Sequence, residues 1–130
     1  MKIHVFIGKF LNRELALKYT EPFWEPEPNE NVSDEEYNEW EDRNPIFEMA
    51  NDLDCFLDSD FIETITDSNK TEYLKSMLEV PSKINATESE LNSEKSVLVL
   101  IFEKAINSED FSFGDTPKLK YKGVFESILK

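Results

Sequence analysis

One run of seven residues near the C-terminal end constrains the fold of this chain more than any other segment. Residues Ser96 to Phe102 read SVLVLIF, and such β-branched and aliphatic side chains are typical of a strand. Because the run is apolar on both faces, it favours a central strand rather than an edge strand. We therefore expect a sheet built around residues 96–102.

Three further segments read as strands, and polar segments with helical spacing separate them. The expected strands are residues 2–8, 55–57 and 119–125, the last with a bulge or kink at Gly123. The expected helices span residues 12–19, 34–42, a segment starting at Asn44 and Pro45, residues 71–78 and, weakly, residues 85–93. This order predicts an α+β protein with a single mixed sheet of about four strands and helices packed against it.

The size of the chain fits one domain. It has 130 residues, of which 39% are hydrophobic, and ten are Phe. That apolar content is too high for a globally disordered protein. We expect residues 1–130 to form a single domain that carries an acidic loop and helix as an insertion at about residues 21–43.

Negative charge is concentrated in one third of the sequence. Residues 21–63 hold 16 of the 28 acidic residues and one basic residue, Arg43, whereas the rest of the chain is close to neutral. Self-repulsion among so many carboxylates opposes compaction, so this charge favours a role in solubility or in binding a cationic partner. It argues against direct binding of nucleic acid, because phosphates would repel it.

Within the acidic segment, a proline-rich loop leads into a well-marked helix start. Ser33 and Glu36 have the spacing of a capping box, and Val32 and Tyr37 fall at the positions of a hydrophobic staple. Tyr37 and Trp40 are three residues apart and should share a face of the helix that follows. The acids near the end of this helix oppose its dipole, and a bound partner is one reason to keep them.

Large aromatics interleaved with acids are typical of a recognition surface. We expect aromatic anchors and carboxylates from the insertion, with two later aspartates as a second patch, to bind a basic partner. These candidates are Trp24, Glu35, Glu36, Tyr37, Glu39, Trp40, Glu41, Asp42, Asp58 and Asp60. A solubilising, partly mobile loop is the alternative interpretation of the same segment.

The sequence offers little for catalysis. A single cysteine, Cys55, and a single histidine, His4, exclude an internal disulfide and give no nucleophile pair, and three glycines leave no phosphate-binding loop. Four aspartates at 52, 54, 58 and 60 have spacing similar to a calcium loop, without its glycine and glutamate. We expect no enzyme, catalytic residue, metal or cofactor. The alternative is a carboxylate-based divalent-metal-binding protein or hydrolase that uses this Asp52–Asp60 cluster.

The first apolar run, Ile3 to Ile7, is too short for a signal-peptide core, and no stretch approaches a membrane span. We therefore expect a cytoplasmic protein without a membrane partner.

Several motifs resemble those of the bacterial immunity-protein family numbered twenty-two. They are the opening MKIHVFIGKF with its short helix to Tyr19, the block NPIFEMANDLDCFLDSDFIE at residues 44–63, the strand at residues 96–102, and the closing Tyr121-x-Gly123-x-Phe125. Two features depart from the family pattern. Leu57 stands where an aromatic residue is expected, and the acidic insertion from Glu25 to Asp42 is not expected throughout the family.

The resemblance implies a cytoplasmic antidote, encoded beside a polymorphic toxin, that protects the producing cell by binding the toxin domain. It implies no catalytic residues. The acidic segment adds a mechanism. Many such toxins are nucleases with basic clefts, and an acidic protein in the cleft would exclude nucleic acid. The sequence thus predicts an immunity protein that neutralises a cognate toxin, a basic protein of the nuclease type, by acidic occlusion of its active cleft.

Overall fold

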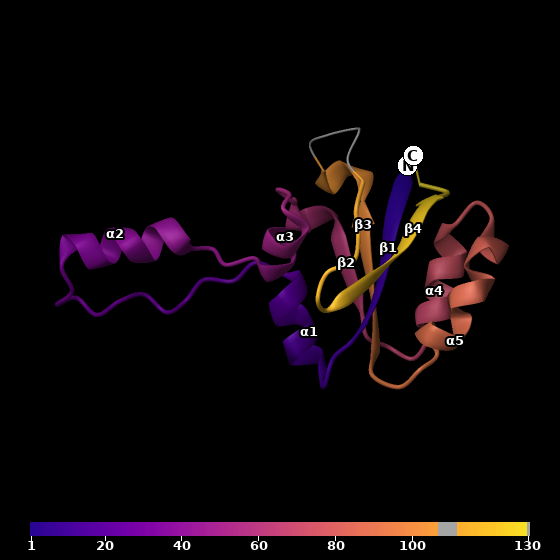
Figure 1. The fold of residues 1–130 in the computed structure, drawn as a ribbon, viewed down its shortest axis with the longest axis horizontal. Coiled ribbons are helices and arrows are strands. Elements are labelled where there is room, and N and C mark those ends of the chain that lie inside the picture. The colour runs from indigo at the N-terminus through magenta and orange to yellow at the C-terminus, as the bar shows by residue number, and fades with distance from the viewer. Residues whose placement is uncertain (107–111, 130) are drawn as a thin grey trace.

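Four strands form one sheet in which β1 and β3 are central and β2 and β4 are the edges, in the order β2-β3-β1-β4. The computed structural model describes residues 1–106 and 112–129. It places the strands at Lys2–Lys9 (β1), Ile62–Ile65 (β2), Ser96–Phe102 (β3) and Leu119–Glu126 (β4), as Figure 1 shows. The predicted α+β class, with helices on a single four-stranded sheet, is confirmed.

All three strand pairings are antiparallel, where the sequence led us to expect a mixed sheet. A connection with helices α4 (Lys70–Met77) and α5 (Glu88–Leu91) joins β2 to β3, and it returns the chain to the end of the sheet where β2 finished. Parallel pairing would require a crossover to the opposite end.

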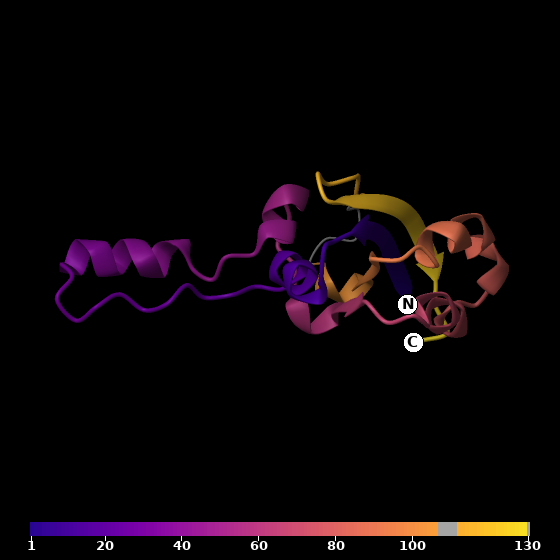
Figure 2. The same ribbon diagram turned by 90° about the horizontal axis from the view of Figure 1, so that it is seen from below.

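Helices cover both faces of the sheet. Figures 1 and 2 show α1 and α3 on one side and α4 and α5 on the other, whereas α2 stands apart from both. The helices are Arg13–Thr20 (α1), Asp34–Arg43 (α2), Glu48–Leu53 (α3), Lys70–Met77 (α4) and Glu88–Leu91 (α5). Short 3₁₀ turns lie at Ser59–Phe61 (η1), Pro81–Thr87 (η2) and Glu103–Ala105 (η3). No helix in these described ranges is long and apolar enough to cross a membrane.

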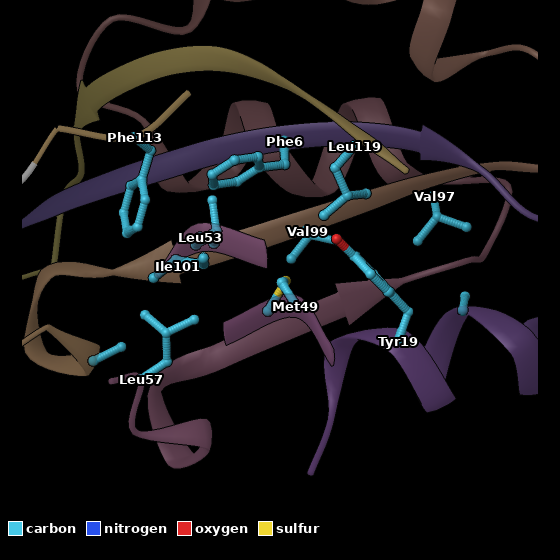
Figure 3. Packing of buried hydrophobic residues seen from close by; sticks show 12 residues of the cluster. Phe6, Tyr19, Met49, Leu53, Leu57, Val97, Val99, Ile101, Phe113 and Leu119 are labelled. Carbon is cyan, nitrogen blue, oxygen red and sulfur yellow. The ribbon is translucent and has the colours of Figure 1, made fainter. Parts of the chain in front are cut away.

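The sheet separates two apolar cores. Alternate residues of β3 point to opposite faces, so Val99 packs with α1 and α3 and Leu100 packs with α4, η2 and α5. Figure 3 shows the first core, in which Phe6, Tyr19 and Met49 meet from three different elements. All of β3 is buried, which confirms that residues 96–102 form a central strand.

The predicted irregularity in the last strand is also present. The pairing between β1 and β4 shifts register between Val5 and Phe6, opposite Gly123. Gly123 has a φ of 117°, a backbone conformation that glycine adopts without the steric cost of a side chain.

The second strand lies later than predicted. Leu57 forms only an isolated bridge with Ile106, and η1 intervenes before β2 begins at Ile62. The carboxylate of Asp58 accepts a hydrogen bond from the backbone N of Asp60, which stabilises this turn between the two segments. The prediction of a strand at residues 55–57 was therefore wrong.

The helix expected to start at Asn44 and Pro45 begins instead at Glu48. Ile46 is held in an extended bridge with Phe23: each backbone N donates to the other's carbonyl oxygen, at 2.7 and 2.9 Å. This bridge prevents a helical turn at residues 44–46, and it closes the base of the segment that carries α2.

Candidate partner-binding surface

Residues 24–45 form an arm that projects from the body of the protein beside α1 and α3 (Figures 1 and 2). Its outgoing limb is an extended, proline-containing chain, and its returning limb is α2, Asp34–Arg43. The arm contains nine acidic residues and one basic residue, Arg43. A predicted insertion of acidic loop and helix thus takes the form of a two-limbed projection.

Polar side chains fix both ends of α2. The Ser33 hydroxyl accepts a hydrogen bond from the backbone N of Glu36 at 3.1 Å, which confirms the predicted cap. At the other end, the side-chain Nδ2 of Asn44 donates a hydrogen bond to the carbonyl oxygen of Trp40 at 2.7 Å. The side-chain Oδ1 of Asn44 accepts a hydrogen bond from the backbone N of Glu25 at 2.9 Å. Asn44 therefore joins the last turn of α2 to the extended limb.

Trp40 holds the two limbs of the arm together. Its side chain is only 9% exposed, its ring centroid lies 5.5 Å from that of Trp24 and 5.3 Å from that of Tyr37, and its Nε1 donates to the carbonyl oxygen of Glu25 at 3.2 Å. Tryptophan buried in this way supplies apolar contact within the arm. The predicted anchor Trp40 is thus placed inside the arm, where it supports the surface rather than forming it.

The other two predicted aromatic anchors differ in exposure. Tyr37 is half-buried, and its hydroxyl donates to Glu27 Oε1 at 3.1 Å, a hydrogen bond that raises the pKa of the phenol. Trp24 is 56% exposed and offers the largest accessible aromatic surface on the arm. Of the three aromatics, Trp24 is therefore the most accessible to a partner, and Tyr37 is accessible in part.

The five predicted acids of α2 all face solvent. They are Glu35, Glu36, Glu39, Glu41 and Asp42. Arg43, the basic residue of the arm, pairs instead with Glu25, with Nε and Oε1 2.6 Å apart. None of the five acids forms an ion pair with a lysine or arginine of the described chain. Their charge is therefore uncompensated and open to a cationic partner.

The second predicted patch lies at the root of the arm. Asp58 is half-buried and Asp60 is exposed, and Asp58 borders an open groove of about 640 Å³. We call this the root groove. It is lined by Pro22, Pro45, Phe47, Ala50, Asn51, Asp54, Cys55, Phe56, Leu57, Asp58 and Ser59. Pro22 precedes the arm and Pro45 is its last residue, and both line the groove, so the root groove adjoins the base of the arm.

Three of the four aspartates of the alternative metal site have separate roles in local structure. Asp52 accepts a hydrogen bond from the Tyr19 hydroxyl at 2.7 Å, Asp54 ends α3 in a left-handed conformation, and Asp58 caps η1. Residues 1–106 and 112–129 contain no group of three or more His, Cys, Asp or Glu side chains positioned to hold a metal ion.

His4 and Cys55 occupy structural environments. His4 is 8% exposed, and its Nδ1 lies 2.8 Å from the Tyr121 hydroxyl; burial lowers the pKa of its imidazole. Cys55 is half-buried at the root groove, and burial raises the pKa of its thiol. This shift is opposite to the lowered pKa that activates a cysteine nucleophile.

Sequence reasoning missed the apolar part of this surface. Phe56 was expected within a strand, but its side chain is 71% exposed beside the root groove. The position of Phe56 between Cys55 and Leu57 could have indicated this exposure. Leu57 packs into the core, and a neighbour in an extended chain points the opposite way.

Comparison with known protein families gives no match for this chain, and searches of curated proteins and of solved structures give none either. The assignment of a function therefore depends on the surface itself and on the motifs in the sequence.

Proposed function

We propose that this chain is a non-enzymatic immunity protein that binds a cognate toxin domain through its acidic arm and neutralises it. The observation that carries the proposal is the arrangement of the arm. Trp40 and Asn44 join its two limbs by aromatic contacts and hydrogen bonds, and all six acidic residues of α2 are exposed and form no ion pair within the described chain. A purely solubilising loop would need no such internal order.

The mechanism is occlusion of a basic cleft. A nuclease cleft is basic because it binds phosphates, and a projecting acidic helix matches it in charge. Carboxylates of α2 would pair with toxin cations, Trp24 would pack against the cleft wall, and Asp58 and Asp60 would contact its rim. Nucleic acid would then be excluded by both charge and volume.

Charge of this kind also accelerates association. Electrostatic steering lifts association rate constants to about 10⁸–10⁹ M⁻¹s⁻¹ at low salt. Rapid capture suits an antidote whose target is harmful as soon as it is free. The resemblance to immunity-protein family twenty-two supplies the same setting, a cytoplasmic antidote encoded beside its toxin.

The test is direct capture of the toxin-like product of the neighbouring gene by this protein, at about 50 mM and about 500 mM salt, conditions that change the Debye length roughly threefold. Tight binding that weakens with salt supports the proposal. Tight binding with the same affinity at both salt concentrations would support the immunity role but would show that the acidic arm is not the main determinant of affinity. Absence of binding at either concentration rejects the toxin assignment.

A matched pair of variants separates the arm from bulk charge. The arm variant carries E35Q, E36Q, E39Q, E41Q and D42N. The control carries E14Q, E72Q, E79Q, E94Q and E126Q, five exposed acids of the body. Both lose five negative charges. We expect slower association and a flatter salt dependence in the arm variant alone. Equal effects in both variants would show that net charge, rather than the arm, drives association.

A further inference from the structure

We infer that the root groove receives an apolar side chain from a segment of the same partner in which that side chain is flanked by arginine or lysine. This inference rests on the proposed function for the identity of the partner. It adds an apolar anchoring point to a surface otherwise described by its charge.

The shape and lining of the groove support an apolar occupant. Phe47 and Leu57 contribute apolar surface from the edge of the core, and the exposed ring of Phe56 stands beside them. An exposed phenylalanine beside an apolar hollow is typical of a site that a partner side chain fills, because filling it removes apolar surface from water on both sides.

The charge around the groove selects the flanking residues of the occupant. Asp54 and Asp58 are the charged residues of its lining, and Asp60 lies next to it in η1. No lysine or arginine lines it within the described residues. A segment with an apolar residue between cations would place its side chain among Phe47, Phe56 and Leu57 and its charges against these carboxylates.

The groove is continuous with the arm. Pro22 precedes the outgoing limb and Pro45 ends the returning limb, and both line the groove. A partner held by the acids of α2 therefore has the groove at the base of its binding surface. Apolar burial at this point would strengthen a contact that charge alone leaves sensitive to salt.

Cys55 reports on occupation of the groove. It is the single cysteine of the chain, it is half-buried, and it lines the groove, so the rate of its alkylation by N-ethylmaleimide measures access to that site. The first probe is a pair of peptides, acetyl-Lys-Arg-Leu-Arg-Lys-amide and its serine analogue. They carry the same charge and differ only in the apolar side chain.

We expect the leucine peptide to slow alkylation of Cys55 at about a tenfold lower concentration than the serine peptide, because burial of a leucine side chain supplies the difference. Equal protection by the two peptides would overturn the inference. In the F56S variant we expect the advantage of leucine to fall by about fivefold, as for removal of one wall of an anchoring pocket. The control is L11S, since Leu11 is 70% exposed and lies outside the groove lining.

The second probe is the toxin domain itself. Binding of the toxin together with slow alkylation of Cys55 supports both the proposed function and the inference. Binding of the toxin with an unchanged alkylation rate would support the proposed function and contradict the inference that the partner occupies the root groove. If the toxin does not bind while the leucine peptide still protects Cys55, the toxin assignment fails and the groove stands as a site for a different basic partner.

Discussion

The body of the protein and its arm are stabilised in different ways. The body buries β1 and β3 between two layers of helices, and its two cores contain nearly all the buried hydrophobic side chains of the described residues. The arm contributes one buried side chain, Trp40, and otherwise depends on a few hydrogen bonds and one ion pair. Apolar burial is therefore the main source of stability in the body, whereas the arm keeps its order with little of it.

Charge divides along the same line. The arm has nine acidic residues and one basic residue, whereas the rest of the chain has 19 acidic and 13 basic residues. In the body, lysines form ion pairs with acidic residues: Lys118 pairs with Glu48 at 2.9 Å and Lys122 with Glu90 at 2.8 Å. The contrast indicates that the fold of the body does not require the acids of the arm, in agreement with the proposed role of these acids in binding.

The two regions can be observed separately in one experiment. Both tryptophans of the chain, Trp24 and Trp40, lie in the arm. Tryptophan fluorescence therefore reports on the arm, and far-UV circular dichroism is dominated by the body. Urea titrations followed by the two signals are expected to give different midpoints if the arm loses its order first, and coincident midpoints would show that both regions unfold together.

The largest effect is expected from a cavity in the body. Leu100 is fully buried at the centre of β3, and L100A should lower the free energy of unfolding by about 2–5 kcal/mol. Urea denaturation followed by circular dichroism measures it. The matched control is L11A, an exposed leucine, for which we expect a change within about 0.5 kcal/mol. A small loss in L100A would break the claim that apolar burial stabilises the body.

Removal of Trp40 tests the arm. W40A deletes the ring that packs on Trp24 and Tyr37, so the arm should lose its order, and binding of the proposed toxin partner should weaken by about 2 kcal/mol or more. Isothermal titration calorimetry measures the affinity. The midpoint of body unfolding, followed by circular dichroism, should remain near that of the wild type.

A second variant, W24A, separates support from contact. Trp24 is exposed, so its loss should weaken binding while leaving α2 largely intact. Unchanged affinity in W40A would show that an ordered arm is not needed for binding. Unchanged affinity in W24A alone would restrict the role of the aromatics to the interior of the arm.

Local signals made most of the elements predictable. The apolar run at residues 96–102, the cap at Ser33 and the glycine at 123 each act within a few residues, and each gave an element that the structure confirms. The start of α3 was missed because a bridge between Phe23 and Ile46 holds the chain extended there. That bridge joins residues far apart in the sequence, so no local sequence pattern predicts it.

The same limit applies to the candidate site. Composition identified the acidic and aromatic residues, but spacing alone could not separate a buried Trp40 from an exposed Trp24. That difference arises when the extended limb folds back on α2. The root groove likewise brings Pro22 together with residues 54–59, a proximity that only the closed base of the arm creates.

Loss of the helix cap should have a moderate, local effect. S33A removes the hydroxyl that accepts from the backbone N of Glu36 and should destabilise α2 by about 1 kcal/mol. Hydrogen exchange of the first α2 amides measures it, and protection of β3 amides should not change. S33D keeps an oxygen acceptor and serves as the control. A loss of protection in β3 as well would mean that arm and body are coupled, contrary to the comparison drawn above.

Acidification should produce the smallest effect, and it should arise in the body, where the single histidine lies. Burial, and to a lesser degree the charge of Lys2, lowers the pKa of His4 from its ordinary value of 6.5, whereas Glu103 opposes the shift. Below pH 6.5 the unfolded chain then binds a proton that the folded chain resists. The stability contributed by neutral His4 is thus complete above pH 6.5 and is lost as the pH falls below it.

The variant H4Q isolates this contribution, because the carboxylates that titrate at lower pH are common to both proteins. We expect the free energy of unfolding to fall more steeply between pH 7.5 and pH 5.5 in the wild type than in H4Q, in urea titrations followed by circular dichroism. Equal slopes would mean that His4 is protonated in the folded state as easily as in the unfolded one, against its burial beside Tyr121 and Phe113. Since the arm has no histidine, its tryptophan fluorescence should not change with pH over this range. A change in that fluorescence would show that the loss of stability in the body also affects the arm, which the Phe23–Ile46 bridge joins to it.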